Sequence, residues 1–212
     1  WENTDTVELA IFFLDAVIQE FINKGANIKG IEDAVRFAKK SRALGLGTLG
    51  WHSYLQSKKI PFISIYAIGQ TNKKLGLIRK QAELATTKLA ELYGEPEWTI
   101  APNRSSSKLA GNLSQGIEPI AANVYVDDDA KGLHIRRNPE LTKVLESKER
   151  NIPEVWDQII ADKGSVVNIR CLSEEEKDVF KTFKEINQLE LVKQAGIRQQ
   201  YIDQGQSLNL AF

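Results

Sequence analysis

Apolar residues in the first third of the chain recur with the period of an α-helix. From Val7 to Asn23 the spacing predicts one helix, with Gly25 as its natural stop. A shorter helix is predicted over residues 31–40, and a long one, with its apolar side chains directed inward, over about residues 72–93. The apolar positions are Leu9, Phe12, Phe13, Ala16, Val17 and Phe21 in the first helix, and Leu75, Ile78, Ala82, Ala85, Leu89 and Leu92 in the long one.

Short apolar runs between polar or glycine-rich residues predict β-strands. Four strands are expected, at residues 98–101, 123–126, 165–172 and 207–212. The aspartate-rich segment 127–132 is predicted to be a solvated turn. Further helices are expected between these strands. The sequence therefore predicts the α/β class, as layers or as a barrel, with many helices and short strands.

The signals for the remaining helices are glycine, proline and capping residues. The segment Leu44–Gly50 predicts a turn or short strand that leads into a helix, which Pro61 ends. Residues 138–161 are predicted to be helical in parts, with an interruption at Pro153. A serine followed three residues later by glutamate is a capping box, and it predicts a helix that starts after Ser173. The last helix is expected over about residues 186–202.

Composition and charge narrow the function classes. The chain has 28 basic and 28 acidic residues among its 212, which argues against a general binder of nucleic acid or of membrane surfaces. No apolar stretch approaches the roughly 18 residues of a membrane span, and no secretion signal opens the sequence. With Cys171 as the only cysteine, no intrachain disulfide can form. His52 and His134 lack metal-ligand spacing. We expect a cytoplasmic protein without a metal site.

The segment Gly45–Gly50 matches the dinucleotide-binding pattern G-x-G-x-x-G. That pattern needs a preceding strand and an acidic residue about 20 positions later. Here the preceding residues predict a helix, and no Asp or Glu occurs from Trp51 to Ala82. A tight glycine turn with close backbone packing is the better interpretation.

The polar segment Ala101–Lys108 is the main candidate site. It follows a predicted strand and precedes a short helical run, so its serines would present N–H and hydroxyl donors at a helix start, where an anion is stabilised. Capping of the helix by the same serines explains the residues somewhat more simply, because capping serines are common. The residues by themselves leave both interpretations open. Glu118 and Cys171 are interpreted as a solvated side chain near a turn and a small buried apolar residue.

Three local sequences together resemble one enzyme family. They are Ser41–Gln56 with Ile60–Phe62 close behind, Ala101–Lys108 with Gly116–Pro119, and Glu174–Phe183 followed by Arg198–Leu210. In this order they are similar to large, catalytic subunits of class I ribonucleotide reductases, over nearly the whole chain. The first resembles the segment after the family's second active-site cysteine, the second its substrate-diphosphate loop, and the third its late barrel segments.

The resemblance implies the C-terminal part of a ten-stranded α/β barrel, as a single partial domain over residues 1–212. Residues 1–97 would be mainly helical, and 98–212 would hold the phosphate loop and late barrel elements. The chain would contribute to reducing ribonucleoside diphosphates to deoxyribonucleotides. The substrate diphosphate would be bound by Ala101, Pro102, Asn103, Arg104, Ser105 and Ser106.

The same resemblance implies that the reaction needs more than this chain. The family's radical cysteine, reducing cysteine pair and catalytic asparagine and glutamate lie upstream of the matched segments, so we expect no catalytic residue and no cofactor here. The partners would be the N-terminal part of the large subunit, a small subunit with a radical-generating metal cofactor, and a dithiol reductant. A first residue Trp1 and the lack of methionine also suggest a processed product or part of a longer chain.

One departure and two alternatives remain. Family members carry an additional stretch, with an Arg-Asn pair, before the loop strand, whereas here Trp98 runs almost directly into Ala101. The alternatives are a non-catalytic module or relic that binds phosphorylated ligands, and an unrelated scaffold in which the serines only cap a helix. An incomplete barrel would expose strand edges, so self-association is also expected.

Overall fold

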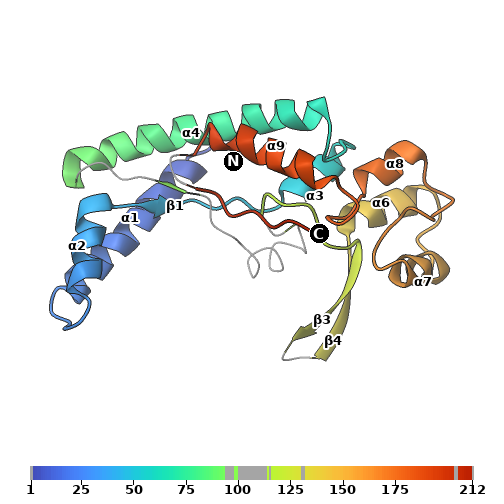
Figure 1. The fold of residues 1–212 in the computed structure, drawn as a ribbon, viewed down its shortest axis with the longest axis horizontal. Coiled ribbons are helices and arrows are strands. Elements are labelled where there is room, and N and C mark those ends of the chain that lie inside the picture. Colours follow the sequence, from blue (N-terminus) through green and yellow to red (C-terminus); the bar gives the residue numbers. More distant parts are fainter. Residues whose placement is uncertain are drawn as a thin grey trace. The chain divides into compact units, whose positions relative to one another are not determined.

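The computed structural model describes residues 2–93, 98–99, 114, 116–129, 132–202 and 205–211 (Figure 1). These residues form two compact units, each described below by itself. The first unit comprises Trp1–Gly47, Gln70–Ala101 and Ala195–Ser207, and the second comprises Thr48–Gly69, Pro102–Gln194 and Leu208–Phe212. Two long helices, α4 (Ile65–Tyr93) and α9 (Gln188–Gln199), contribute residues to both units.

The first unit is built on helix α1 (Thr6–Gly25), helix α2 (Glu32–Ser41) and the larger part of α4. All three helices were predicted, although α4 begins seven residues before the expected start because Ser64 caps it, accepting the Ala67 N–H at 3.1 Å. The core of this unit consists of Val7, Ile11, Leu44, Leu75, Ile78, Ala82, Ala85 and Leu89. For α4 the predicted inward face is therefore confirmed at five of its six positions.

The inward face of α1 contains few of the apolar residues whose spacing predicts the helix. Its buried side chains include Val7, Ile11 and Ile22, whereas Leu9, Phe13, Val17 and Phe21 are exposed. The helix carries apolar residues on two sides, and the periodicity of the sequence does not say which side packs against the rest of the unit.

Two very short strands pair in the first unit. Strand β1 (Leu44–Gly45) lies parallel to β2 (Trp98–Thr99), with Leu44 opposite Trp98. Parallel strands need a long crossover connection, and α3 and α4 lie between these two in the sequence. The expected strand at 98–101 is confirmed for its first two residues, and its other two residues lie outside the described part of the chain.

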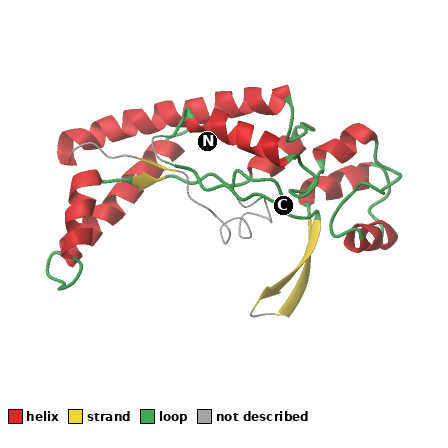
Figure 2. Cartoon of the chain, in the orientation of Figure 1, coloured by secondary structure: helices red, strands yellow, loops and turns green. Residues whose placement is uncertain are grey.

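The second unit contains short helices and one β-hairpin (Figure 2). The helices are α3 (Trp51–Ser57), α6 (Pro139–Ser147), α7 (Pro153–Ala161) and α8 (Glu174–Val179). The capping box of α8 is confirmed, with Ser173 and Glu176 exchanging hydrogen bonds. Leu141, Leu145, Trp156, Ile159, Val166, Ile169, Leu172 and Phe180 form the main buried cluster of this unit.

The hairpin consists of strands β3 (Val124–Asp129) and β4 (Gly132–Arg137), paired in antiparallel register with Val126 opposite Ile135. The strand predicted at 123–126 is longer than expected. The turn predicted over 127–132 is wrong at Asp127–Asp129, because ladder pairing continues the strand through the three aspartates. In Figure 2 the hairpin extends away from the helices of its unit.

Two predicted strands are absent from the described residues. Residues 165–172 form consecutive turns, in which the Ile169 N–H donates to the Val166 carbonyl at 3.0 Å and the Leu172 N–H to that of Ile169 at 3.3 Å. Val166, Ile169 and Leu172 are buried at a spacing of three, so the run is apolar without the alternation of a strand. Residues 207–211 likewise form no strand.

Candidate functional site

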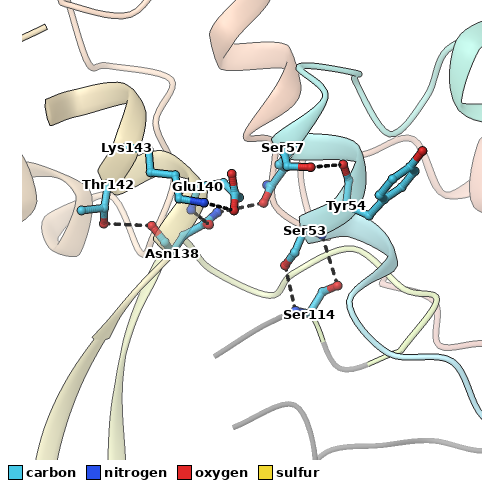
Figure 3. A network of polar contacts seen from close by, with 9 residues as sticks. Ser53, Tyr54, Ser57, Ser114, Asn138, Glu140, Thr142 and Lys143 are labelled. Carbon is cyan, nitrogen blue, oxygen red and sulfur yellow. Dashed lines mark hydrogen bonds and ion pairs between the residues drawn. The ribbon is translucent and has the colours of Figure 1, made fainter. Parts of the chain in front are cut away.

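The start of helix α3 is joined to a segment about 60 residues later in the sequence. Gly50 precedes the helix with φ of +77°, a conformation that suits glycine, and it has no side chain to cap the helix. The Ser114 hydroxyl fills this role by accepting the N–H groups of His52 at 3.1 Å and Ser53 at 3.3 Å. The Ser53 hydroxyl accepts the Ser114 N–H in return, at 2.9 Å (Figure 3).

Two backbone contacts strengthen this junction. The Gly50 N–H donates to the Ser114 carbonyl at 2.9 Å, and the Trp51 N–H to the Gly116 carbonyl at 3.1 Å. Four N–H groups at the helix start are thereby satisfied by residues 114 and 116, which lie directly after the predicted phosphate loop in the sequence. Ser114 and Gly116 are therefore tied to α3 at their backbone. We call Ser53 and Ser114 the serine pair.

His52 holds the same segment slightly further on. Its Nδ1 accepts the Ile120 N–H at 3.0 Å, and its ring meets Phe62 edge-on with centroids 5.1 Å apart. Burial lowers the pKa of His52 from 6.5 to about 4, and the nearby Val179 carbonyl opposes this shift only in part. The imidazole is neutral at pH 7, with its proton on Nε2. This agrees with the structural role expected for His52.

Glu118 is bound by the end of the chain. Its carboxylate accepts the Asn209 backbone N–H at 2.8 Å and the Asn209 side-chain amide at 3.1 and 3.0 Å. The carboxylate is thus engaged in hydrogen bonds with protein groups, rather than only solvated as expected.

A buried network of side-chain amides holds Asn123, which follows Ile120 closely in the sequence. The Asn138 side-chain amide donates to Gln56 Oε1 at 3.0 Å and Asn123 Oδ1 at 2.8 Å. That of Asn123 donates to the carbonyls of Gly164 at 3.0 Å and Phe180 at 2.8 Å. Such a fully paired network fixes its elements in one arrangement. Asn138 also caps α6, and Figure 3 shows it beside Thr142.

All six residues predicted to bind the substrate phosphate, Ala101, Pro102, Asn103, Arg104, Ser105 and Ser106, lie outside the described residues. That site stays a prediction. The structure describes residues that follow the loop in the sequence, which are held by contacts of the serine pair, His52 and Asn123. The sequence patterns did not identify these four residues as a group. Only Asn138, directly before the proline that opens α6, carries a local signal, because Asn-Pro is a typical helix start.

The other candidate residues have structural surroundings. Cys171 is partly buried against the main apolar cluster of the second unit. Strand β1 leads into the motif Gly45–Gly50 and helix α3 follows it, so the expectation that a helix directly precedes the motif is wrong. The lack of any Asp or Glu from Trp51 to Ala82 still argues against a dinucleotide site. Among the described residues, no group of three or more His, Cys, Asp or Glu side chains could hold a metal ion. No helix in this part of the chain combines the length and apolar character needed to cross a membrane.

Comparison with known proteins decides the family. The family model described as "Ribonucleotide reductase, barrel domain" matches residues 2–98 and 97–212. The chain belongs to this family. The two matches overlap at residues 97–98, next to the departure from the family pattern that is expected after Trp98.

Individual relatives agree with this assignment. The chain is 40% identical, over its full length, to a putative ribonucleoside-diphosphate reductase large subunit of Frog virus 3, of which it covers 40%. It is 37% identical over 99% of its length to the large subunit of Invertebrate iridescent virus 6, and covers 24% of it. Among solved structures, the class Id ribonucleotide reductase alpha subunit of Actinobacillus ureae matches with a TM-score of 0.91 and 40% identity, over 99% of this chain and 41% of that one.

These matches confirm the predicted resemblance to class I large subunits and the predicted fold class, part of an α/β barrel. The parallel pair β1–β2 is consistent with a barrel of this kind. The chain spans about two fifths or less of the length of these relatives.

Proposed function

We propose that this chain supplies the substrate-diphosphate loop of a ribonucleoside-diphosphate reductase, with Ala101–Ser106 wrapping the phosphates. Backbone N–H groups and the hydroxyls of Ser105 and Ser106 would donate to the phosphate oxygens, and Arg104 would add positive charge. The observation that carries the proposal is the match of the reductase barrel model to residues 2–98 and 97–212, a range that includes the loop motif.

The serine pair supports this proposal. A loop that binds phosphate through backbone N–H groups needs fixed ends, since each misplaced donor loses its hydrogen bond. Ser114 and Gly116 lie within ten residues of the loop in the sequence and are bonded to the start of α3. Ser114 and Gly116 therefore provide fixed backbone positions after the loop in the sequence.

The chemistry itself requires groups beyond this chain. Reduction at the ribose 2′-carbon in this family uses a cysteine radical and a pair of reducing cysteines, and Cys171 is the only thiol here. We propose that the thiols come from the remaining part of the large subunit, the radical from a small subunit with a metal cofactor, and the electrons from a dithiol. The isolated chain would then bind substrate without converting it.

Binding of a nucleoside diphosphate to the chain, measured by calorimetry, tests the loop assignment. Double substitution of Ser105→Ala and Ser106→Ala is expected to weaken binding by at least about tenfold, since a hydrogen bond to a charged group contributes roughly 1.5–3 kcal/mol. The control Ser147→Ala removes an exposed serine of α6 and should leave binding unchanged. Equal affinity of the double variant and the original chain would contradict the assignment.

A turnover assay tests whether the reaction needs the remaining part of the large subunit in addition to this chain. The chain is incubated with a ribonucleoside diphosphate, a dithiol and a small subunit, and deoxyribonucleotide formation is measured. We expect none, and activity should appear when the polypeptide with the remaining part of the large subunit is added. Product formed by this chain alone would refute the proposal. Substrate binding that remains without turnover after that addition would favour a phosphate-binding module.

A further inference from the structure

Helix α1 carries a row of exposed apolar side chains along four turns. The exposed fractions are 55% for Leu9, 68% for Phe13, 51% for Val17 and 41% for Phe21. The four residues are spaced by four, so they form a continuous ridge along the helix. We call these four side chains the α1 ridge.

The opposite side of α1 already packs against its own unit. Val7 and Ile11 belong to the buried core with α4, and Glu8 forms an ion pair with Lys88 of that helix. The core therefore does not need the α1 ridge. A helix that is apolar on two sides is typical of a position between two packing partners.

The polar residues of α1 leave the ridge uncovered. Glu20 pairs with Lys24 at 2.7 Å, and the Gln19 side-chain amide donates to Asn23 Oδ1 at 2.9 Å. These two contacts join residues of α1 itself. The polar side chains of α1 that reach other elements, Glu8, Asp15 and Gln19, lie on the side of the helix opposite the ridge, because their positions differ from those of the ridge by about half a turn. Two phenylalanines and two aliphatic residues on one surface are characteristic of an interaction site.

The comparisons indicate what covers the ridge. The chain matches part of a barrel domain and covers about 40% of its relatives, so most of a large subunit lies outside it. Barrels of alternating strands and helices surround their strands with a layer of helices that pack on one another. Ridges of residues spaced by four pack into the matching grooves of another helix, at a crossing angle near −50°.

We propose that the α1 ridge is the docking surface for an apolar helix from the remaining part of the same large subunit. The partner is a helix with small or aliphatic residues spaced by three or four, into whose groove Phe13 and Val17 insert. This inference rests on the proposed function in one respect, that the chain works as part of a complete large subunit.

Thiol labelling of the complete large subunit that contains this segment tests the proposal. Phe13→Cys and, as the control, Ser147→Cys are each labelled with a maleimide in the native subunit and in urea. Mass spectrometry of the peptides reads each cysteine separately. We expect the labelling rate of Phe13→Cys to be at least 100-fold lower in the native subunit than in urea. The labelling rate of Ser147→Cys in the native subunit should differ from its rate in urea by no more than a few-fold.

The outcomes separate this proposal from the proposed function. Rapid native labelling of Phe13→Cys in a subunit that still reduces nucleotides overturns the docking surface and leaves the function intact. Slow native labelling of Phe13→Cys in a subunit that does not reduce nucleotides supports the docking surface and contradicts the proposed function. Protection that disappears when the subunit is diluted to monomers overturns the proposal in favour of a second copy as the occupant. Protection that persists on dilution supports it.

Discussion

Asp15 and Arg42 bury a carboxylate and a guanidinium together in the first unit. Arg42 Nε donates to Asp15 Oδ1 at 2.9 Å, Nη1 donates to Gln19 at 2.9 Å, and both charged side chains are about 95% buried. Arg42 also has φ of +42°, which is uncommon outside glycine. The sequence gives no sign of this pair, because its members are 27 residues apart and only the packing of α1 beside the end of α2 brings them together.

We predict that Arg42→Met destabilises the chain by about 3–5 kcal/mol, since it leaves the Asp15 carboxylate buried without its partner. Urea denaturation followed by circular dichroism measures this loss. Arg36→Met is the control, because the Arg36–Asp33 pair is exposed and should contribute less than about 1 kcal/mol. Adding Asp15→Leu to Arg42→Met should restore much of the stability, and equal effects of the two arginine substitutions would contradict the prediction.

His52 makes folding depend on pH. Its pKa of about 4 in the folded state lies below the ordinary value of 6.5. Between these two pH values His52 is therefore mostly protonated in the unfolded state and mostly neutral in the folded state. The contribution of His52 is fully present above pH 6.5 and is lost as the pH falls from 6.5 through 4. Between pH 7 and pH 4.5 we predict a loss of about 2–3 kcal/mol from this residue.

The variant His52→Asn isolates that loss. The asparagine Oδ1 can take the Ile120 N–H that Nδ1 accepts, but it does not titrate. The free energy of unfolding is measured in urea at pH 7 and at pH 4.5. Its decrease between the two pH values should be smaller for this variant than for the original chain, while carboxylates contribute to the decrease in both proteins. Identical pH dependence of the two proteins would show that His52 is not the titrating group.

At the scale of elements, the sequence predicts most helices well and the strands poorly. Helices α1, α2, α4 and α9 follow from periodicity, because one apolar side over several turns is a strong pattern. The hairpin and residues 165–172 do not, because pairing and turns depend on contacts with distant residues. Pro153 was expected to interrupt a helix. It lies at the first position of α7, where its missing N–H costs nothing.

Gly164 illustrates such a distant contact after the end of α7. It has φ of +87°, and its carbonyl accepts both the backbone and side-chain N–H groups of Asn123, each at 3.0 Å. A Cβ at this position would lie 2.3 Å from that of Ala122. The end of helix α7 and the residue before β3 therefore approach so closely that only glycine fits.

We predict that Gly164→Ala destabilises the chain by about 2–4 kcal/mol, from the strained backbone and the overpacked contact together. Gly69→Ala is the control, since Gly69 lies in α4 with open space around its Cα and should gain about 0.5–1 kcal/mol from helix propensity. Thermal unfolding of both variants provides the comparison, and a neutral Gly164→Ala would mean that the segment 122–123 can move away.

At the scale of the whole molecule, family membership and fold class were accessible from the sequence because three motifs occur in order over nearly the full chain. The phosphate site remains a prediction, since Ala101–Ser106 lie outside the described residues. The contacts of Ser114, which follows this site in the sequence, could not be predicted, because the serine pair joins residues 61 positions apart. A capping residue is recognisable in a sequence only when it is near the helix it caps.

The charge balance of the whole chain also has a measurable consequence. With 28 basic and 28 acidic residues the net charge is close to zero at pH 7, and the α1 ridge adds exposed apolar surface. We predict that the isolated chain is least soluble near pH 7 and more soluble at pH 9, where it carries negative charge. Precipitation with ammonium sulfate at several pH values measures this, and a minimum at pH 9 would contradict it.

The capping of α3 by Ser114 also sets an order of events during synthesis. A seven-residue helix without its cap is marginal in water, and this cap is made 61 residues after Ser53. Helix α3 therefore gains its full stability only after the chain has been synthesised through Ser114, beyond the predicted phosphate loop. A nascent chain arrested before Ser114 therefore contains the predicted loop but lacks the residue that caps α3.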